Sequence, residues 1–238
     1  MKYFYSVLSC LSLSAIFFAQ VSLARNRPAE LSQPAAVQSS QPELHLAQAQ
    51  AMNYVNRGLL RNRRGDYQGA VSDFTQALQL DPTYIDAYNY RGASRSVLGD
   101  SQGAIDDFTQ SIKLNPRDAA VYLGRGLVRD VAGDRRGAID DFTKAIALQP
   151  TYTDAYLNRG VSRAVIGDQQ GALDDYNQVI QIRPNDAEAH YNRGLLLLSV
   201  SDRASALTAF EKAADYFRRK GDANGYQLAV KQIILLHR

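Results

Sequence analysis

Apolar and polar residues recur with a period of 34 residues through most of the chain. Within one period, residues 88–98 place small or apolar side chains at helical spacing, and residues 102–114 carry an apolar stripe of the same kind. Between these two segments, Gly99 can adopt the left-handed conformation that ends a helix, and Asp100 can cap the next helix. Each period therefore predicts a unit of helix, turn and helix.

The period is kept by columns of glycine, alanine, aromatic residues and proline. These columns are Gly58, Gly92, Gly126, Gly160 and Gly194; Ala70, Ala104, Ala138, Ala172 and Ala206; Phe74, Phe108, Phe142, Tyr176 and Phe210; and Pro82, Pro116, Pro150 and Pro184. The small residues predict a close crossing of two helices, with the aromatic ring filling the space beside it. One pair of helices leaves an apolar face uncovered, so the units must stack on one another to be stable.

On these columns the chain resembles the tetratricopeptide repeat family, with units at residues 51–84, 85–118, 119–152, 153–186 and 187–220. It is similar to the bacterial variant that carries Asn-Arg-Gly in the first helix, as in Asn56-Arg57-Gly58. The resemblance implies an all-α fold, a right-handed superhelix or α-solenoid, whose concave groove is lined by the first helices. It also implies that the protein binds another protein or a peptide. The fifth unit diverges, and residues 221–238 are expected to form a helix that caps the stack.

The resemblance also places candidate binding residues on the first helix of each unit. They are Asn56, Leu59, Asn89, Tyr90, Leu123, Leu127, Asn158, Val161, Tyr191, Asn192 and Leu195. The asparagines offer both a donor and an acceptor to an extended peptide backbone, and the apolar residues would form the floor of the groove. The alternative is that the apolar residues complete the core while the asparagines face water.

Two arginine columns run along the same face of the first helices. Arg57, Arg91, Arg125, Arg159 and Arg193 form one, and Arg61, Arg95, Arg129 and Arg163 lie four residues later. Aspartates in the second helices, such as Asp107, are suited to planar two-pronged pairing with these guanidinium groups. We therefore expect a ladder of Arg–Asp pairs. The alternative, an arginine track for anionic ligands, is disfavoured because a formal net charge of +3 gives no strong field.

Residues 1–24 have the features of a secretory signal peptide: Lys2, an apolar run, and small residues before a cut after Ala24. Residues 25–50 contain Pro, Gln, Ser and Ala, which favours a flexible linker. We therefore expect export, to the periplasm by default, with secretion or an internal lumen as alternatives, and a membrane anchor if the leader is not cleaved. No other membrane contact is expected.

The sequence offers little catalytic chemistry. The single cysteine, Cys10, lies in the leader, and His190 takes the place of a tyrosine in its column, which indicates an aromatic packing role. We therefore expect no enzyme, no metal site, no cofactor and no nucleic-acid partner. The favoured function is a protein-binding scaffold. The alternative is a structural spacer or self-assembly module that forms oligomers through its C-terminal helix.

Overall fold

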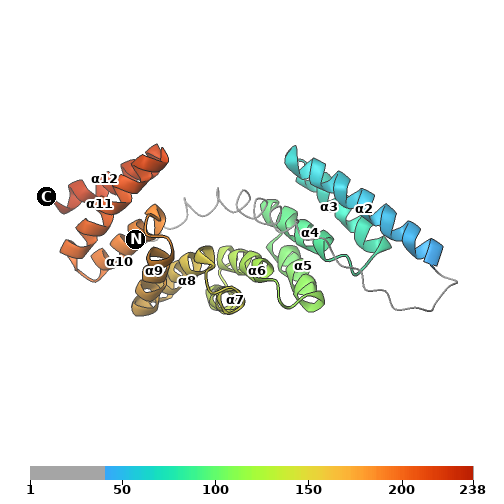
Figure 1. The fold of residues 1–238 in the computed structure, drawn as a ribbon, viewed down its shortest axis with the longest axis horizontal. Helices are drawn as coiled ribbons and strands as arrows, with labels where there is room; N and C mark the ends of the chain where they lie inside the picture. The colour runs from blue at the N-terminus through green and yellow to red at the C-terminus, as the bar shows by residue number, and fades with distance from the viewer. Residues whose placement is uncertain (1–40, 238) are drawn as a thin grey trace. The chain divides into compact units, whose positions relative to one another are not determined.

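The computed structural model describes residues 41–237, and they form α-helices with no strand in that range. This confirms the predicted all-α repeat fold. The leader and residues 25–40 of the predicted linker lie outside the described residues. Figure 1 shows the helices in chain order: α2 (Gln41–Arg63), α3 (Tyr67–Leu80), α4 (Ile85–Val97), α5 (Ser101–Leu114), α6 (Ala119–Val131), α7 (Arg135–Leu148), α8 (Thr153–Ile166), α9 (Gln169–Ile182), α10 (Ala187–Ser199), α11 (Arg203–Lys220) and α12 (Ala223–Leu236).

The helices are divided between two compact units, residues 1–132 and 133–238, of which the structure describes residues 41–132 and 133–237. In the first unit, each helix from α2 to α6 packs on the next, and α4 also contacts both α2 and α6. In the second unit, the helices from α7 to α12 pack in the same consecutive order, and α8 contacts α10. Within each unit the first helices of neighbouring repeats therefore lie in one layer.

The turns inside the repeats have the predicted chemistry. Gly99 has a φ of +82°, a conformation that strains residues with a Cβ. The carboxylate of Asp100 then accepts a hydrogen bond from the Gly103 backbone N–H at 2.9 Å, which caps α5. The fifth repeat has Ser201 at the turn, with a φ of 67°. Serine therefore takes the strained conformation there.

A glycine and an aromatic ring meet where the two helices of a repeat cross. A Cβ added at Gly160 would lie 2.7 Å from Cε1 of Tyr176, and one added at Gly92 would lie 3.2 Å from Cε1 of Phe108. Both rings are buried. The close approach of the helices therefore excludes a Cβ at Gly160 and leaves little room for one at Gly92, as the sequence predicted.

The first helix begins ten residues before the predicted unit boundary. Residues 41–50, predicted to be part of the flexible linker, belong to α2, and this corrects the linker to end before Gln41. The segment is rich in Gln, Glu, Leu and Ala, which are good helix formers, and Pro42 lies in the first turn, where a missing N–H costs nothing.

The last helix covers the end of the second unit. α11 runs to Lys220 and ends at Gly221, which has a φ of 76°, and α12 then packs back on it. Ala229 of α12 is fully buried in the hydrophobic cluster that contains Phe210 and Phe217 of α11, and Ile233 packs against the same cluster. Ile234 and Leu235 are exposed on the other side of α12. The helix therefore caps the repeat and also presents an apolar edge.

The helix crossings predict different responses to the same substitution. Gly160→Ala should lower the thermal midpoint because overpacking costs about 1–3 kcal/mol, only partly offset by about 1 kcal/mol of helix propensity. Gly92→Ala is the matched control, because its Cβ has more room and the midpoint should change little. Thermal unfolding followed by circular dichroism measures both. Equal midpoints for the two variants would contradict the packing described.

Candidate functional site

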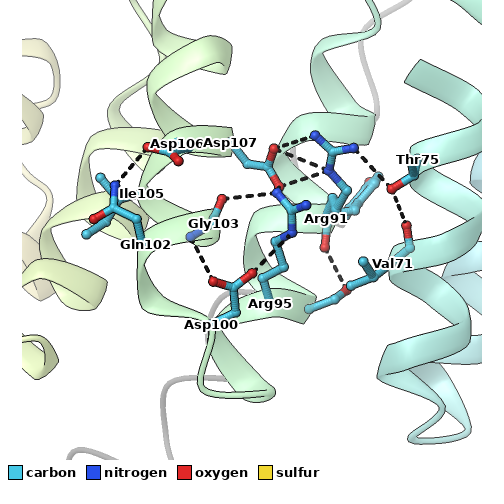
Figure 2. A network of polar contacts seen from close by, with 12 residues as sticks. Val71, Thr75, Arg91, Arg95, Asp100, Gln102, Gly103, Ile105, Asp106 and Asp107 are labelled. Atoms are coloured by element: carbon cyan, nitrogen blue, oxygen red, sulfur yellow. Dashed lines mark hydrogen bonds and ion pairs between the residues drawn. The ribbon is translucent and has the colours of Figure 1, made fainter. Parts of the chain in front are cut away.

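Arginines from the first helices hold a buried aspartate from the second helix of the same repeat. In the second repeat, Nη2 of Arg91 lies 2.6 Å from Oδ1 of Asp107, and Nη1 of Arg95 lies 2.7 Å from Oδ2 (Figure 2). Asp107 is almost fully buried. Two guanidinium groups thus compensate one desolvated carboxylate. The same triad recurs as Arg57, Arg61 and Asp73, and as Arg159, Arg163 and Asp175.

The first arginine of each triad also reaches back to the preceding repeat. Nη1 of Arg91 donates to Oγ1 of Thr75 at 3.1 Å, which Figure 2 shows beside the ion pairs. The corresponding bonds join Arg125 to Thr109, Arg159 to Thr143, and Arg193 to Asn177. Each of these arginines therefore ties a first helix to the second helix of the preceding repeat. The predicted Arg–Asp ladder is confirmed, and the Arg–Thr link is a finding of the structure.

A tyrosine three residues before the arginine supports the guanidinium group. The Arg91 guanidinium carbon lies 5.7 Å from the ring centroid of Tyr88, and the ring of Tyr156 is 5.5 Å from the same atom of Arg159. At these distances the cation is attracted to the face of the ring. The aromatic column of the first helices thus positions the arginines.

The fifth repeat lacks most of this network. Ala209 stands where the buried aspartate would be, and Leu197 replaces the second arginine. Nε of Arg193 is buried without an acceptor, and burial lowers the pKa of this guanidinium. His190 replaces the tyrosine. Its Nε2 lies 3.0 Å from the Pro184 carbonyl oxygen, and its Nδ1 is buried without a partner.

Four of the predicted groove residues are buried. Tyr90 stacks on Phe74 with ring centroids 5.7 Å apart, and Tyr191 packs at 5.6 Å from Phe210. Asn89 and Leu123 are also almost inaccessible. For the three apolar residues among them, the alternative that they complete the core is the better description.

The other predicted groove residues are accessible to different degrees. Leu59, Leu127, Val161, Asn158, Asn192 and Leu195 are half-buried, and Asn56 is exposed. Nδ2 of Asn158 donates to the backbone oxygen of Asp154 in its own helix, so that amide is partly occupied. Apolar side chains such as Leu127 therefore remain partly available at the surface. The asparagines differ in how much of their amide group is accessible for binding.

A row of exposed valines extends this surface and was not predicted. Val97, Val131 and Val165 occupy the same position in three successive repeats, and all three are exposed. Val131 lies four residues after Leu127, and Val165 four after Val161, so each pair lies on one side of its helix. We call these two pairs, together with Val97, the valine row. It consists of Val97, Leu127 and Val131 in the first unit and of Val161 and Val165 in the second.

Two buried amide groups of the first unit have unused hydrogen-bonding capacity. Oδ1 of Asn89 in α4 has no donor, and Nδ2 of Asn62 in α2 has no acceptor. The Oδ1 of Asn62 accepts from the hydroxyl of Ser94 at 3.0 Å, which links α2 to α4. A buried polar group without a partner costs free energy, so Asn89 and Asn62 would gain from additional polar contacts.

A model of the tetratricopeptide repeat family, described as TPR repeat, matches residues 58–95 and 166–200. The matched segments contain the glycine, alanine and aromatic columns that the structure places at the helix crossings. The chain therefore resembles the tetratricopeptide repeat family in these segments and has the all-α repeat fold of TPR proteins. No curated protein sequence matches it.

Solved structures of TPR proteins resemble this chain over most of their own length. MamA is 26% identical, with a TM-score of 0.66 over 69% of this chain and 96% of MamA. MamA of Desulfovibrio magneticus RS-1 is 19% identical, with a TM-score of 0.68 over 71% of this chain and 96% of that protein. YrrB, described as a TPR protein with an unusual peptide-binding site, is 22% identical, with a TM-score of 0.64 over 81% of this chain and all of YrrB.

The TPR fold supports a role as a scaffold for protein–protein interaction, and TPR proteins are in general non-catalytic. Within residues 41–237, no three His, Cys, Asp or Glu side chains are grouped so that they could hold a metal ion. None of the helices described here combines the length and the apolar character needed to cross a membrane.

The buried ladder predicts a large effect of a small substitution. Asp107→Asn should destabilise the protein by about 3–5 kcal/mol, because the buried carboxylate is the counter-charge of two half-buried guanidinium groups. Asp215→Asn is the control: its partners Arg218 and Arg219 are exposed, and such surface pairs contribute about 0–1 kcal/mol. Urea unfolding measures both. A loss at Asp107 no larger than at Asp215 would show that the ladder is dispensable.

His190 predicts a dependence of stability on pH. Burial lowers the pKa of His190, so the unfolded chain binds the proton more readily than the folded chain. The resulting stabilisation is present above the ordinary histidine pKa of about 6.5 and is lost as the pH falls through the lower pKa of the folded state. His190→Tyr should flatten the change in unfolding free energy between about pH 7 and pH 5, and the exposed His237→Gln should leave it unchanged. An unaltered slope in His190→Tyr would refute this assignment.

Proposed function

We propose that this protein is an exported, non-catalytic scaffold that binds a peptide or a helix of another protein along the layer of its first helices. The observation that carries the proposal is the valine row. Val97 and Val131 are exposed at the same position of two repeats in the first unit, and Val165 is exposed at that position in the second unit, one helical turn after Val161. Apolar strips of this kind are characteristic of interaction surfaces.

The polar surroundings of the valine row suit a main chain without a fixed sequence. Half-buried Asn158 and Asn192 lie on the same helices as Val161 and Leu195 and can donate to or accept from peptide groups. YrrB supports the proposal, because this TPR protein of the same fold has a peptide-binding site.

A rigid scaffold reduces the cost of binding. The first helices are fixed by the Arg–Asp and Arg–Thr contacts before any partner arrives, so little conformational entropy is lost on their side. A peptide of extended or helical form would bury Val97 and Val131 in the first unit. The second unit offers Val161 and Val165 for the same purpose.

Export is part of the proposal and rests on the sequence of residues 1–24 alone. A cut after Ala24 would remove the only cysteine, which suits an oxidising compartment. Periplasmic location follows as the default, with secretion, a lumen or membrane anchoring as the other outcomes of processing. Mass spectrometry of the mature N-terminus distinguishes a cleaved leader from a retained one.

One observation favours a second candidate function, self-assembly through the C-terminal helix. Tyr226, Ile234 and Leu235 are exposed on α12. This side of α12 could pair with a second copy, which would make the repeats a spacer between contacts. Sedimentation of the full chain and of an Ile234→Glu variant tests this candidate separately from peptide binding.

The valine row predicts the outcome of a selection experiment. Peptides selected from a random display library on the purified chain should bind at least tenfold more weakly to Val131→Glu, because the charge occupies the apolar strip. Gln110→Glu introduces the same charge at an exposed position of α5 and should bind as the parent chain does. Failure to select any peptide, or equal affinity for both variants, would contradict binding at this surface.

A further inference from the structure

Among the described residues, nothing covers one side of α2 from Leu46 to Leu60. Leu46, Asn53, Arg57 and Leu60 are spaced by seven, four and three residues, so they lie on one face of the helix, here called the α2 outer face. Leu46 is 59% exposed and Leu60 is 51% exposed. The Arg57 side chain is 56% exposed, compared with 14% for Arg91 and 12% for Arg159.

Two of these positions, those of Asn53 and Leu60, are buried in every later repeat. The counterparts of Asn53 are Ala87, Val121, Ala155 and Ala189, and the counterparts of Leu60 are Ser94, Val128, Ser162 and Leu196. All of them are nearly inaccessible. The α2 outer face is therefore a surface of a kind that the rest of this chain always covers.

The structure shows what covers this surface elsewhere. Val121 and Val128 of α6 pack with Ile105 and Ile112 of the preceding α5, and Arg125 donates to Thr109 of the same helix. The second helices, which cover this surface in later repeats, share a pattern of three residues. It consists of an aliphatic residue, a hydrogen-bond acceptor four residues later, and a second aliphatic residue three residues after the acceptor. These sets are Val71, Thr75 and Leu78; Ile105, Thr109 and Ile112; Ile139, Thr143 and Ile146; and Leu173, Asn177 and Ile180.

Arg57 has an unused donor that matches this pattern. Its Nε and Nη2 bind Asp73, as the corresponding atoms of Arg91 bind Asp107. In Arg91, Arg125, Arg159 and Arg193, Nη1 donates to the preceding helix. No helix precedes α2 among the described residues, so Nη1 of Arg57 lacks the acceptor that the later arginines have. The bonds to Asp73 already fix the orientation of the Arg57 guanidinium group.

We propose that the α2 outer face binds a helix of another protein that imitates the second helix of a repeat and so extends the array by one helix. The partner helix carries a hydroxyl, amide or carboxylate acceptor for Nη1 of Arg57. An aliphatic residue four positions before the acceptor packs on Leu60, and the residue three positions after the acceptor lies over Asn53. This site is separate from the valine row and does not depend on the function proposed above.

A second copy of the chain fits this face poorly. The last helix, α12, is the one that a second copy would offer to this face. Its N-terminal cap, in which Asp222 accepts from the Gly225 N–H, corresponds to the cap of α3, in which Asp66 accepts from the Gly69 N–H, and so aligns the two helices. In this register Lys231 takes the place of Thr75, and Gln227 that of Val71. Stacking α12 on α2 would bring Lys231 against Arg57, and like charges in a contact are unfavourable.

A pocket beside the face indicates how the partner helix ends. It has a volume of about 350 Å³ and is lined by Gln50, Asn53, Tyr54, Gln76, Gln79 and Leu80. In the later repeats the residue equivalent to Tyr54 contacts the proline turn that follows the preceding helix: Tyr122 donates to the Pro116 carbonyl oxygen at 3.4 Å. The Tyr54 hydroxyl can donate in the same way to a backbone carbonyl oxygen of a turn that follows the partner helix.

A mimic of the covering helix tests the proposal. The probe is a fluorescent peptide with the sequence of residues 101–118, in which Gln102→Lys forms a lactam with Asp106 to hold the helix; both positions are exposed in the structure. Anisotropy with the full chain should show saturable binding. Leu60→Glu should weaken it at least tenfold, and Thr109→Val in the peptide should weaken it because Arg57 loses its acceptor.

The controls separate this face from its alternatives. Met52→Glu alters an equally exposed residue on another side of α2 and should leave binding unchanged. Absence of peptide binding, or binding that Leu60→Glu does not affect, would overturn the proposal. Self-association of the full chain that Leu60→Glu abolishes would show that a second copy, and not a foreign helix, occupies the face. Circular dichroism of each variant confirms that the fold is intact.

Discussion

A single arginine position carries the connection between successive repeats. In Arg91 and Arg159, one guanidinium group binds a buried aspartate of its own repeat and a threonine of the preceding repeat. Placing these charges out of water is costly, and only the complete set of partners compensates for it. The helices of both neighbouring hairpins must therefore sit in one register, and this constraint fixes the layer of first helices on which the valine row lies.

The ends of the array show what happens when the arrangement is incomplete. Arg57 has its aspartate and no preceding helix, so it is largely exposed. Arg193 has its preceding Asn177 and no aspartate, because Ala209 occupies that position, and its Nε is buried without an acceptor. At Arg57 the missing helix leaves an exposed surface that we propose binds a partner. At Arg193 the missing aspartate leaves a buried donor without an acceptor next to His190, which lowers local stability.

The sequence was sufficient for the features that depend on local chemistry. The caps at residues such as Asp100 follow from neighbouring residues, and the glycine crossings follow from columns that recur with the period; both were confirmed. The candidate site was predicted less well, because the exposure of a side chain depends on how closely its first helix packs against the neighbouring helices. Tyr90 stacks on Phe74 and is lost to the core, whereas Val131, at the end of its helix, stays exposed. The start of α2 was missed because the linker and helix compositions there are alike.

The central claim is that shared arginines couple adjacent repeats, and a double-mutant cycle between Arg91 and Thr75 measures this coupling directly. Arg91→Leu, Thr75→Val and the combined variant are compared by urea unfolding. Residues joined in one network show interaction energies of about 0.5–3 kcal/mol, and a value in this range is predicted. Additive effects of the two substitutions would show that the link between repeats does not pass through this arginine.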